Sequence, residues 1–130
     1  MNGKITDTDY ERLLAFRDRL RRFLYWSERQ AIEAGITPAQ YQLLLAIRGH
    51  GGEPTVGDVA DHLLLRHHSV VGLIDRAEAA GLVSRRTDPQ DHRIVRLRLT
   101  KTGAAHLAAL AAAHLDELTR LGSGLMRVRS

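Results

Sequence analysis

The sequence contains no cysteine, which excludes disulfide bonds, thiolate metal ligands and thiol-based redox sensing. No apolar run approaches the length needed to span a bilayer, and Met1–Asp7 are not followed by the hydrophobic segment of a secretory signal. Aromatic residues are scarce, with one Trp, three Tyr and two Phe. From these absences we expect a cytoplasmic protein that has no membrane partner.

Recognisable catalytic motifs are also missing. The sequence has no Gly-rich phosphate loop, no Gly-x-Ser-x-Gly and no His-Glu-x-x-His, and its seven histidines include no pair four residues apart. We therefore expect neither an enzyme nor a cofactor. The 130 residues are enough for one domain with a modest core, and a chain this short favours one subunit of an oligomer.

The stretch Arg66–Ala80 predicts an amphipathic helix. Apolar residues recur at three- and four-residue spacing from Val70 to Ala77, and Gly81 offers a left-handed stop. The opposite face has the composition of a contact surface: His67, His68, Ser69, Val71, Gly72, Asp75 and Arg76.

A shorter helix is predicted directly upstream. Thr55 and Asp58 have the spacing of a capping box, with Asp in place of Glu, and apolar residues continue to Leu63. Two helices joined by so few residues must cross steeply, which is the geometry of a helix-turn-helix.

Two strand-like runs follow, Leu82–Thr87 and Arg93–Leu99, with the polar loop Asp88–His92 between them. In the second run Val95, Leu97 and Leu99 are predicted to face inward. This order favours a winged helix-turn-helix over an unrelated α+β domain.

The charge is concentrated in this region. The whole chain carries a net charge of +4, and Arg66–Lys101 alone contains eight Lys or Arg against four acidic residues, whereas the remainder balances at eleven of each. Such an excess on one segment favours binding to a polyanion such as nucleic acid.

Long helices are predicted on both sides. The first runs from about Thr8 to Ala34 and is closed by Gly35, and Thr37-Pro-Ala-Gln40 begins a second. Thr100 can cap a last helix, which we expect to continue to about Leu121. We expect Gly122-Ser-Gly124 to end it and to leave the short basic tail 125–130.

With these pieces in order, the chain resembles the MarR family of winged-helix regulators over nearly its whole length. The motifs that carry the resemblance are Thr37-Pro-Ala-Gln40, Thr55-Val-Gly-Asp-Val-Ala60, Ser69-Val-Val-Gly-Leu-Ile-Asp-Arg76, Gly81-Leu-Val83, Asp88-Pro-Gln-Asp-His-Arg93 and Leu99-Thr-Lys-Thr-Gly103. The most specific are the Asp-x-x-Asp-x-Arg wing and the Leu-Thr-x-x-Gly that follows it.

The resemblance implies a mainly α (α+β) single domain spanning 1–130. Residues 36–99 would form a winged helix-turn-helix lobe with a two-stranded wing, and 1–35 and 100–130 would be dimerisation helices. It further implies a sequence-specific, double-stranded DNA-binding homodimer that represses at a pseudo-palindromic operator and is released by a small, often aromatic, ligand. Tyr25 and Trp26 are candidates for the wall of a ligand pocket, although core or dimer packing is the commoner use of such residues.

Roles for individual residues follow from groove chemistry. In a major groove His68 and Ser69 would hydrogen-bond to bases, Val71 would contact a thymine methyl and Gly72 would permit close approach. Arg93 matches the family arginine that enters the minor groove. The further candidate contacts are Arg66, His67, Arg76, Arg85, Arg86 and Arg96, of which the last three would attract the phosphate backbone. We expect Asp91 to brace the wing loop.

Two departures from the family pattern lead to expectations of their own. Leu64-Leu65-Arg66 stands where the family has Gly, Leu and a small polar residue, so we expect the turn to avoid a left-handed residue. Only nine residues follow Leu121, so we expect a dimer interface that is reduced or built more heavily from the first helix.

Two alternative functions remain open from the sequence. A winged helix can serve as a protein-interaction module, although the net basic face favours DNA. A metal-responsive regulator is the other alternative, since Asp58 and His62 lie four residues apart and His68 is expected nearby.

Overall fold

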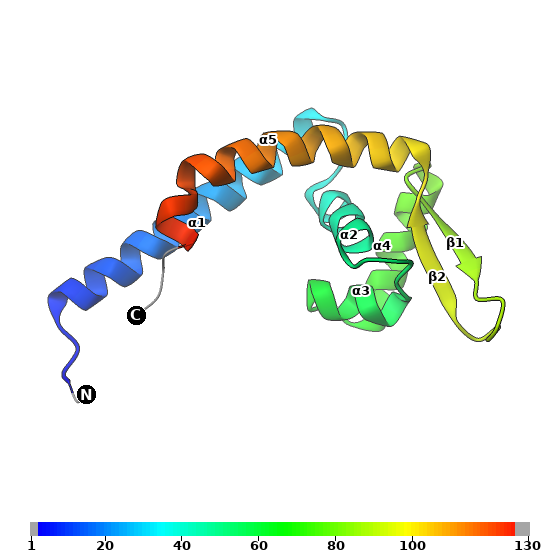
Figure 1. Cartoon of the computed structure of the whole chain (residues 1–130), viewed down its shortest axis with the longest axis horizontal. Helices are drawn as coiled ribbons and strands as arrows, with labels where there is room; N and C mark the ends of the chain where they lie inside the picture. The colour runs from blue at the N-terminus through cyan, green and yellow to red at the C-terminus, as the bar shows by residue number, and fades with distance from the viewer. Residues whose placement is uncertain (1–2, 127–130) are drawn as a thin grey trace.

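The computed structural model describes residues 3–126 and places two long helices along an arm beside a small lobe (Figure 1). The elements in chain order are α1 (Asp7–Glu33), α2 (Pro38–Gly49), α3 (Val56–Leu63), α4 (His67–Ala79), β1 (Val83–Thr87), β2 (Val95–Leu99) and α5 (Lys101–Met126). Helices α1 and α5 run side by side, and α2, α3, α4 and the hairpin gather at one end of α5 (Figure 1). The predicted winged helix-turn-helix class is confirmed.

Capping fixes where the first three helices begin. Thr6, Thr37 and Thr55 each accept a hydrogen bond from the backbone N–H three residues on, and the side chain there accepts one from the threonine N–H. These bonds satisfy N–H groups that a helix start otherwise leaves free.

The last helix ends later than its glycines suggest. The expected end near Leu121 is wrong, because α5 continues through Gly122 and Gly124 to Met126. Glycine lowers helix stability by about 1 kcal/mol without forbidding the conformation, so a helix that is already long can run through it. Within the predicted basic tail, residues 127–130 lie outside the described part of the chain.

The core lies where α2, α4 and the wing meet. Leu43, Leu44, Ile74 and Leu97 are fully buried there, and Leu107 extends the same cluster onto α5. On β2, Leu97 is buried while Val95 and Leu99 are half-buried, so the predicted inward face is correct in direction. The hairpin is antiparallel and pairs Val83 with Leu99 and Thr87 with Val95.

The start of α5 is locked to the residues that follow α4. Thr100 donates a hydrogen bond through its hydroxyl to the Gly81 carbonyl (2.6 Å), and that hydroxyl accepts one from the Gly103 N–H (3.0 Å). The Leu-Thr-x-x-Gly motif thus joins the wing, the end of α4 and the long helix at one point.

No helix within residues 3–126 combines the length and the apolar character needed to cross a membrane.

Candidate nucleic-acid interface

The turn between α3 and α4 contains a left-handed residue. Leu64 has φ 56° and ψ 42°, and the Leu65 N–H donates to the Ala60 carbonyl. The expectation that this turn avoids such a residue is wrong. The steric cost of this conformation to a residue with a β-carbon is outweighed because the steep crossing of the two helices requires a left-handed end to α3.

Helix α4 presents the predicted contact residues on one side. Val70, Leu73, Ile74 and Ala77 are buried against the lobe. On the other side Arg66, His67, His68 and Ser69 are exposed around the first turn, Val71 and Gly72 are half-buried, and Arg76 is exposed one turn further on.

The first turn of α4 lacks a side-chain cap. Arg66 occupies the N-cap position and makes no capping hydrogen bond. An uncapped helix start offers backbone N–H groups and a partial positive charge, both of which favour a phosphate. The exposed Arg66 guanidinium adds a full charge beside them.

Gly72 has a use that differs from the predicted close approach to DNA. A β-carbon at this position would lie 3.5 Å from Nη1 of Arg76, so the Arg76 side chain folds back over the glycine. The missing side chain leaves a shallow step on which the guanidinium rests.

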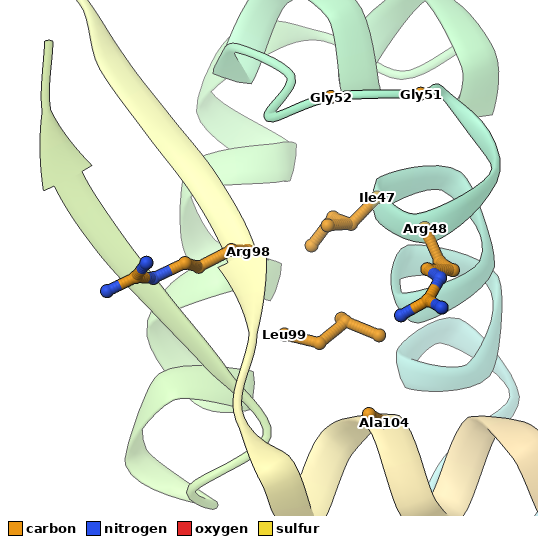
Figure 2. Close-up of a pocket in the computed structure, with 7 residues that line it drawn as sticks. All are labelled: Ile47, Arg48, Gly51, Gly52, Arg98, Leu99 and Ala104. Carbon is orange, nitrogen blue, oxygen red and sulfur yellow. The ribbon is translucent and has the colours of Figure 1, made fainter.

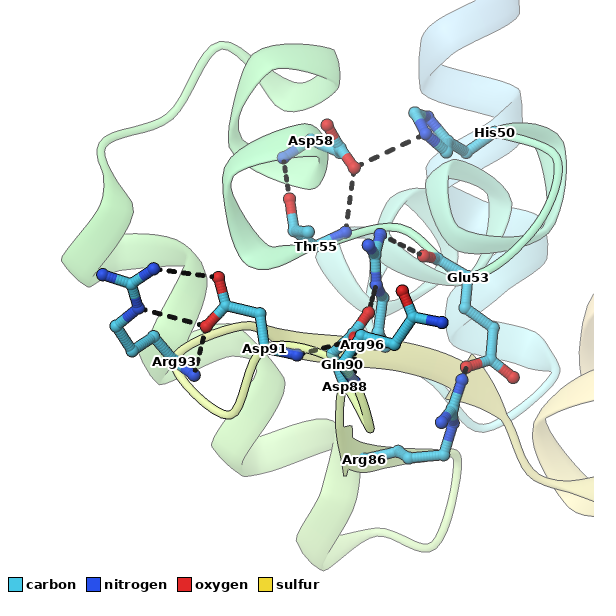
Figure 3. Close-up of polar contacts among 10 residues, drawn as sticks. All are labelled: His50, Glu53, Thr55, Asp58, Arg86, Asp88, Gln90, Asp91, Arg93 and Arg96. Carbon is cyan, nitrogen blue, oxygen red and sulfur yellow. Dashed lines mark hydrogen bonds and ion pairs between the residues drawn. The ribbon is translucent and has the colours of Figure 1, made fainter.

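The wing carries its exposed cation at the tip. Arg93 is 90% exposed, and Asp91 accepts hydrogen bonds from both its backbone N–H and its guanidinium, at 3.1 Å each (Figure 3). The Arg93 guanidinium and N–H hold the pKa of Asp91 below its usual range, and Asp91 in turn raises the pKa of Arg93. The expectation that Asp91 braces the loop is confirmed.

A second set of ion pairs holds the base of the wing. The Arg96 guanidinium donates to Asp88 (3.0 Å) and to the Glu53 carbonyl (3.2 Å), while Arg86 pairs with the Glu53 carboxylate (Figure 3). The Gln90 N–H and the Arg96 guanidinium lower the pKa of Asp88. Glu53 was not predicted from the sequence, because no local pattern links it to an arginine 33 residues away.

Arg85 is also held inside the lobe. It pairs with Asp75 and Glu78 on the outer side of α4, and although burial opposes its charge, these two hydrogen bonds raise its pKa. Arg85, Arg86 and Arg96 therefore each have carboxylate partners, and their positive field outside the lobe is reduced. Arg66, Arg76 and Arg93 are the more exposed predicted cations.

The two candidate ligand residues lie in different environments. Tyr25 is 67% exposed on α1. Trp26 is half-buried, and its ring centroid lies 4.9 Å from that of His114, which also stacks on Tyr41 at 4.7 Å. His114 was missed because it lies in an alanine-rich stretch of α5. It is buried, with its ring nitrogens 2.7 Å from Ser27 Oγ and from the Leu110 carbonyl.

A separate hollow of about 450 Å³ lies between α2, β2 and α5 (Figure 2). Its lining includes Ile47, Arg48, Leu99 and Ala104. Neither Tyr25 nor Trp26 is part of this lining, so the hollow and the aromatic cluster are two distinct places.

The predicted metal grouping does not form. Among the residues that the structure describes, no three or more His, Asp or Glu side chains are placed to hold a metal ion, so Asp58, His62 and His68 do not make a three-ligand site.

The lobe matches a known family model. Residues 34–94, which cover α2, the helix-turn-helix and the wing, match the model described as MarR family. This chain belongs to the MarR family. The resemblance inferred from the motifs is thereby confirmed.

Three curated relatives are similar at about the same level. They are the transcriptional repressor MdtR of Bacillus subtilis (32% identical, 53% of this chain and 44% of the relative), the regulator YkoM of the same organism (30%, 76% and 64%) and the repressor NicR of Pseudomonas putida (31%, 71% and 59%). The chain thus spans between about half and two thirds of their lengths. All three are named as transcriptional regulators, which agrees with the expectation that this chain is not an enzyme.

Solved MarR structures share the fold over most of the chain. The MarR family regulator SP03579 superposes with a TM-score of 0.78 at 26% identity (91% of this chain, 78% of that one). Bordetella bronchiseptica BpsR gives 0.63 at 26% (87% and 83%), and Staphylococcus aureus MepR gives 0.70 at 23% (85% and 80%). At these values the superpositions support the five-helix winged fold of the MarR family.

Proposed function

We propose that this MarR-family chain is a dimeric repressor that binds a pseudo-palindromic DNA operator. The observation that carries the proposal is the joint exposure, on one lobe, of the first turn of α4 and of Arg93 at the wing tip. A helix of this kind fits a major groove, and an arginine on an adjacent wing fits the neighbouring minor groove. MepR supports the proposal, since it has been solved bound to an oligodeoxyribonucleotide.

Dimerisation is proposed from the outer face of α1. Leu13 and Leu14 are 60% and 61% exposed, and Leu20, Leu24 and Ile32 are also exposed on this helix. A row of exposed leucines on one long helix is costly in water, and a second copy of the arm would cover it. A double change, Leu13→Asp and Leu14→Asp, should convert the dimer to a monomer in sedimentation equilibrium, whereas wild type should sediment as a dimer.

Release by a small aromatic ligand is the third part of the proposal. BpsR supports it, because 6-hydroxynicotinic acid regulates the DNA binding of that protein. In this chain the half-buried Trp26 lies between α1 and α5, where a flat ligand could stack. Displacement of bound DNA by a panel of aromatic acids, weakened by Trp26→Ala, would support this part.

The deciding experiment is selection of sequences from a random pool of duplexes. We expect an inverted repeat whose half-sites lie about one helical turn apart. Arg93→Ala should weaken binding by about 1–3 kcal/mol, and Arg98→Ala, on the same hairpin but outside the predicted contact set, should change it much less. Recovery of no motif, or equal effects of the two variants, would contradict the proposal and favour a protein-interaction module.

A further inference from the structure

Two histidines from different helices meet beside the helix-turn-helix. His50 is the C-cap residue of α2 and His62 lies in the last turn of α3. Nδ1 of His50 is 3.0 Å from Nε2 of His62, and the two rings are nearly perpendicular. Both residues are exposed. The fold therefore brings together two imidazole nitrogens that are 12 residues apart in the sequence.

The separation of these nitrogens fits a shared metal ion. With metal–nitrogen bonds of about 2.0–2.1 Å, two imidazole ligands lie about 2.9 Å apart at a right angle and about 3.4 Å apart at a tetrahedral angle. The observed 3.0 Å lies within this range. Neutral imidazole suits zinc, copper and nickel in particular.

Asp58 supplies the support that metal-binding histidines commonly have. Its Oδ2 lies 3.5 Å from Nε2 of His50, which is the ring nitrogen facing away from His62 (Figure 3). A carboxylate at this position favours a proton on Nε2 and leaves Nδ1 free to bind a metal. The Thr55 N–H fixes the carboxylate by donating to the same oxygen at 2.9 Å, and this bond is the main reason that the pKa of Asp58 is lowered.

The site is open on its remaining side. His50 and His62 line a hollow of about 400 Å³, together with Gln42, Leu45 and Leu63 among others. Because no third His, Asp or Glu in the described residues completes a protein cage, water or an external ligand would fill the other coordination positions.

We propose that His50 and His62 form a two-histidine site for a divalent transition metal, Zn²⁺, Ni²⁺ or Cu²⁺, with Asp58 as the positioning residue of His50. The site clamps the end of α2 to α3. It differs from the three-ligand grouping expected from the sequence, because His50 replaces His68 and Asp58 acts behind a histidine. The proposal does not depend on DNA binding or on dimerisation.

The test is isothermal titration calorimetry of the untagged full chain with NiCl₂ and, separately, ZnCl₂. We expect one ion per chain, and a weakening of at least about tenfold in both His50→Gln and His62→Gln. Asp58→Asn keeps an acceptor for the Thr55 N–H and should weaken binding by about 10- to 100-fold. Circular dichroism without metal checks that each variant is folded.

The matched control is the double variant His67→Gln and His68→Gln, which removes the other histidine pair of the lobe. It should bind metal as wild type does. The proposal is overturned if wild type binds neither ion, if the His50 and His62 variants retain wild-type affinity, or if the control abolishes binding.

Discussion

Gly103 lies directly against the backbone of Leu82, so that a β-carbon at position 103 would come within 1.9 Å of the Leu82 carbonyl oxygen. The same oxygen accepts a hydrogen bond from the Thr100 N–H at 3.1 Å. The glycine of the Leu-Thr-x-x-Gly motif is therefore required by a close approach of backbones, since its position inside α5 would otherwise favour alanine.

Gly103→Ala should lower the free energy of unfolding by about 3 kcal/mol, at the upper end of the usual cost of overpacking, because the obstructing atoms belong to the backbone. Urea unfolding followed by circular dichroism measures this change. Gly49→Ala is the matched control, because Gly49 ends α2 and a β-carbon there meets nothing within 4 Å. Equal stability of the two variants would contradict the argument.

Leu64 carries the conformational cost of the helix-turn-helix. It is left-handed and 90% exposed, so its side chain contributes almost no packing. Leu64→Gly should raise the stability by up to about 1 kcal/mol, because removing the steric cost of about 1–2 kcal/mol outweighs the added freedom of the unfolded chain.

Leu65→Gly is the comparison for that substitution. Among the described non-glycine residues Leu64 alone has a positive φ, so glycine at position 65 brings only an entropic cost. It should destabilise by about 0.5–1 kcal/mol. The interpretation of the turn fails if both substitutions shift the urea midpoint in the same direction.

Local signals predicted most of the fold. The threonine caps at Thr37 and Thr55 indicated helix starts that the structure reproduces, because a capping box lies within four residues of sequence. The end of α5 and the conformation of Leu64 were mispredicted because packing in three dimensions overrides the local preference of glycine and leucine. In both places the residue type is a weak guide to the backbone.

The candidate site was predicted less completely. The exposed residues of α4 follow from helical periodicity, and Arg93 follows from its motif. The partners of Arg85, Arg86 and Arg96 could not be predicted, because Asp75, Glu53 and Asp88 reach them only after the hairpin has folded onto the lobe. The pairing of His50 with His62 likewise depends on how α2 and α3 cross.

The pH dependence of stability should reveal the base of the wing. The pKa of Asp88 is below its ordinary 3.8 because its ionised form accepts hydrogen bonds from the Gln90 N–H and from Arg96. Its contribution to folding is therefore complete above about pH 3.8 and is lost as the pH falls through the lowered pKa. Asp88→Asn should remove part of the stability lost by wild type between about pH 5 and pH 2.5 in urea titrations. An unchanged loss in the variant would show that Arg96 does not stabilise the ionised carboxylate.

The first turn of α4 leads to a prediction about DNA binding itself. His67 and His68 are exposed beside the uncapped helix start, and histidine is the side chain that gains charge as the pH falls from about 8 to 6. If either faces phosphate, affinity for the selected operator should rise about two- to fivefold over this range, which is the size expected for exposed ion pairs. The double variant His67→Gln and His68→Gln should flatten that dependence in fluorescence anisotropy at constant ionic strength. A pH dependence that persists in the double variant would assign it to other groups, and no dependence in wild type would remove both histidines from the phosphate contacts.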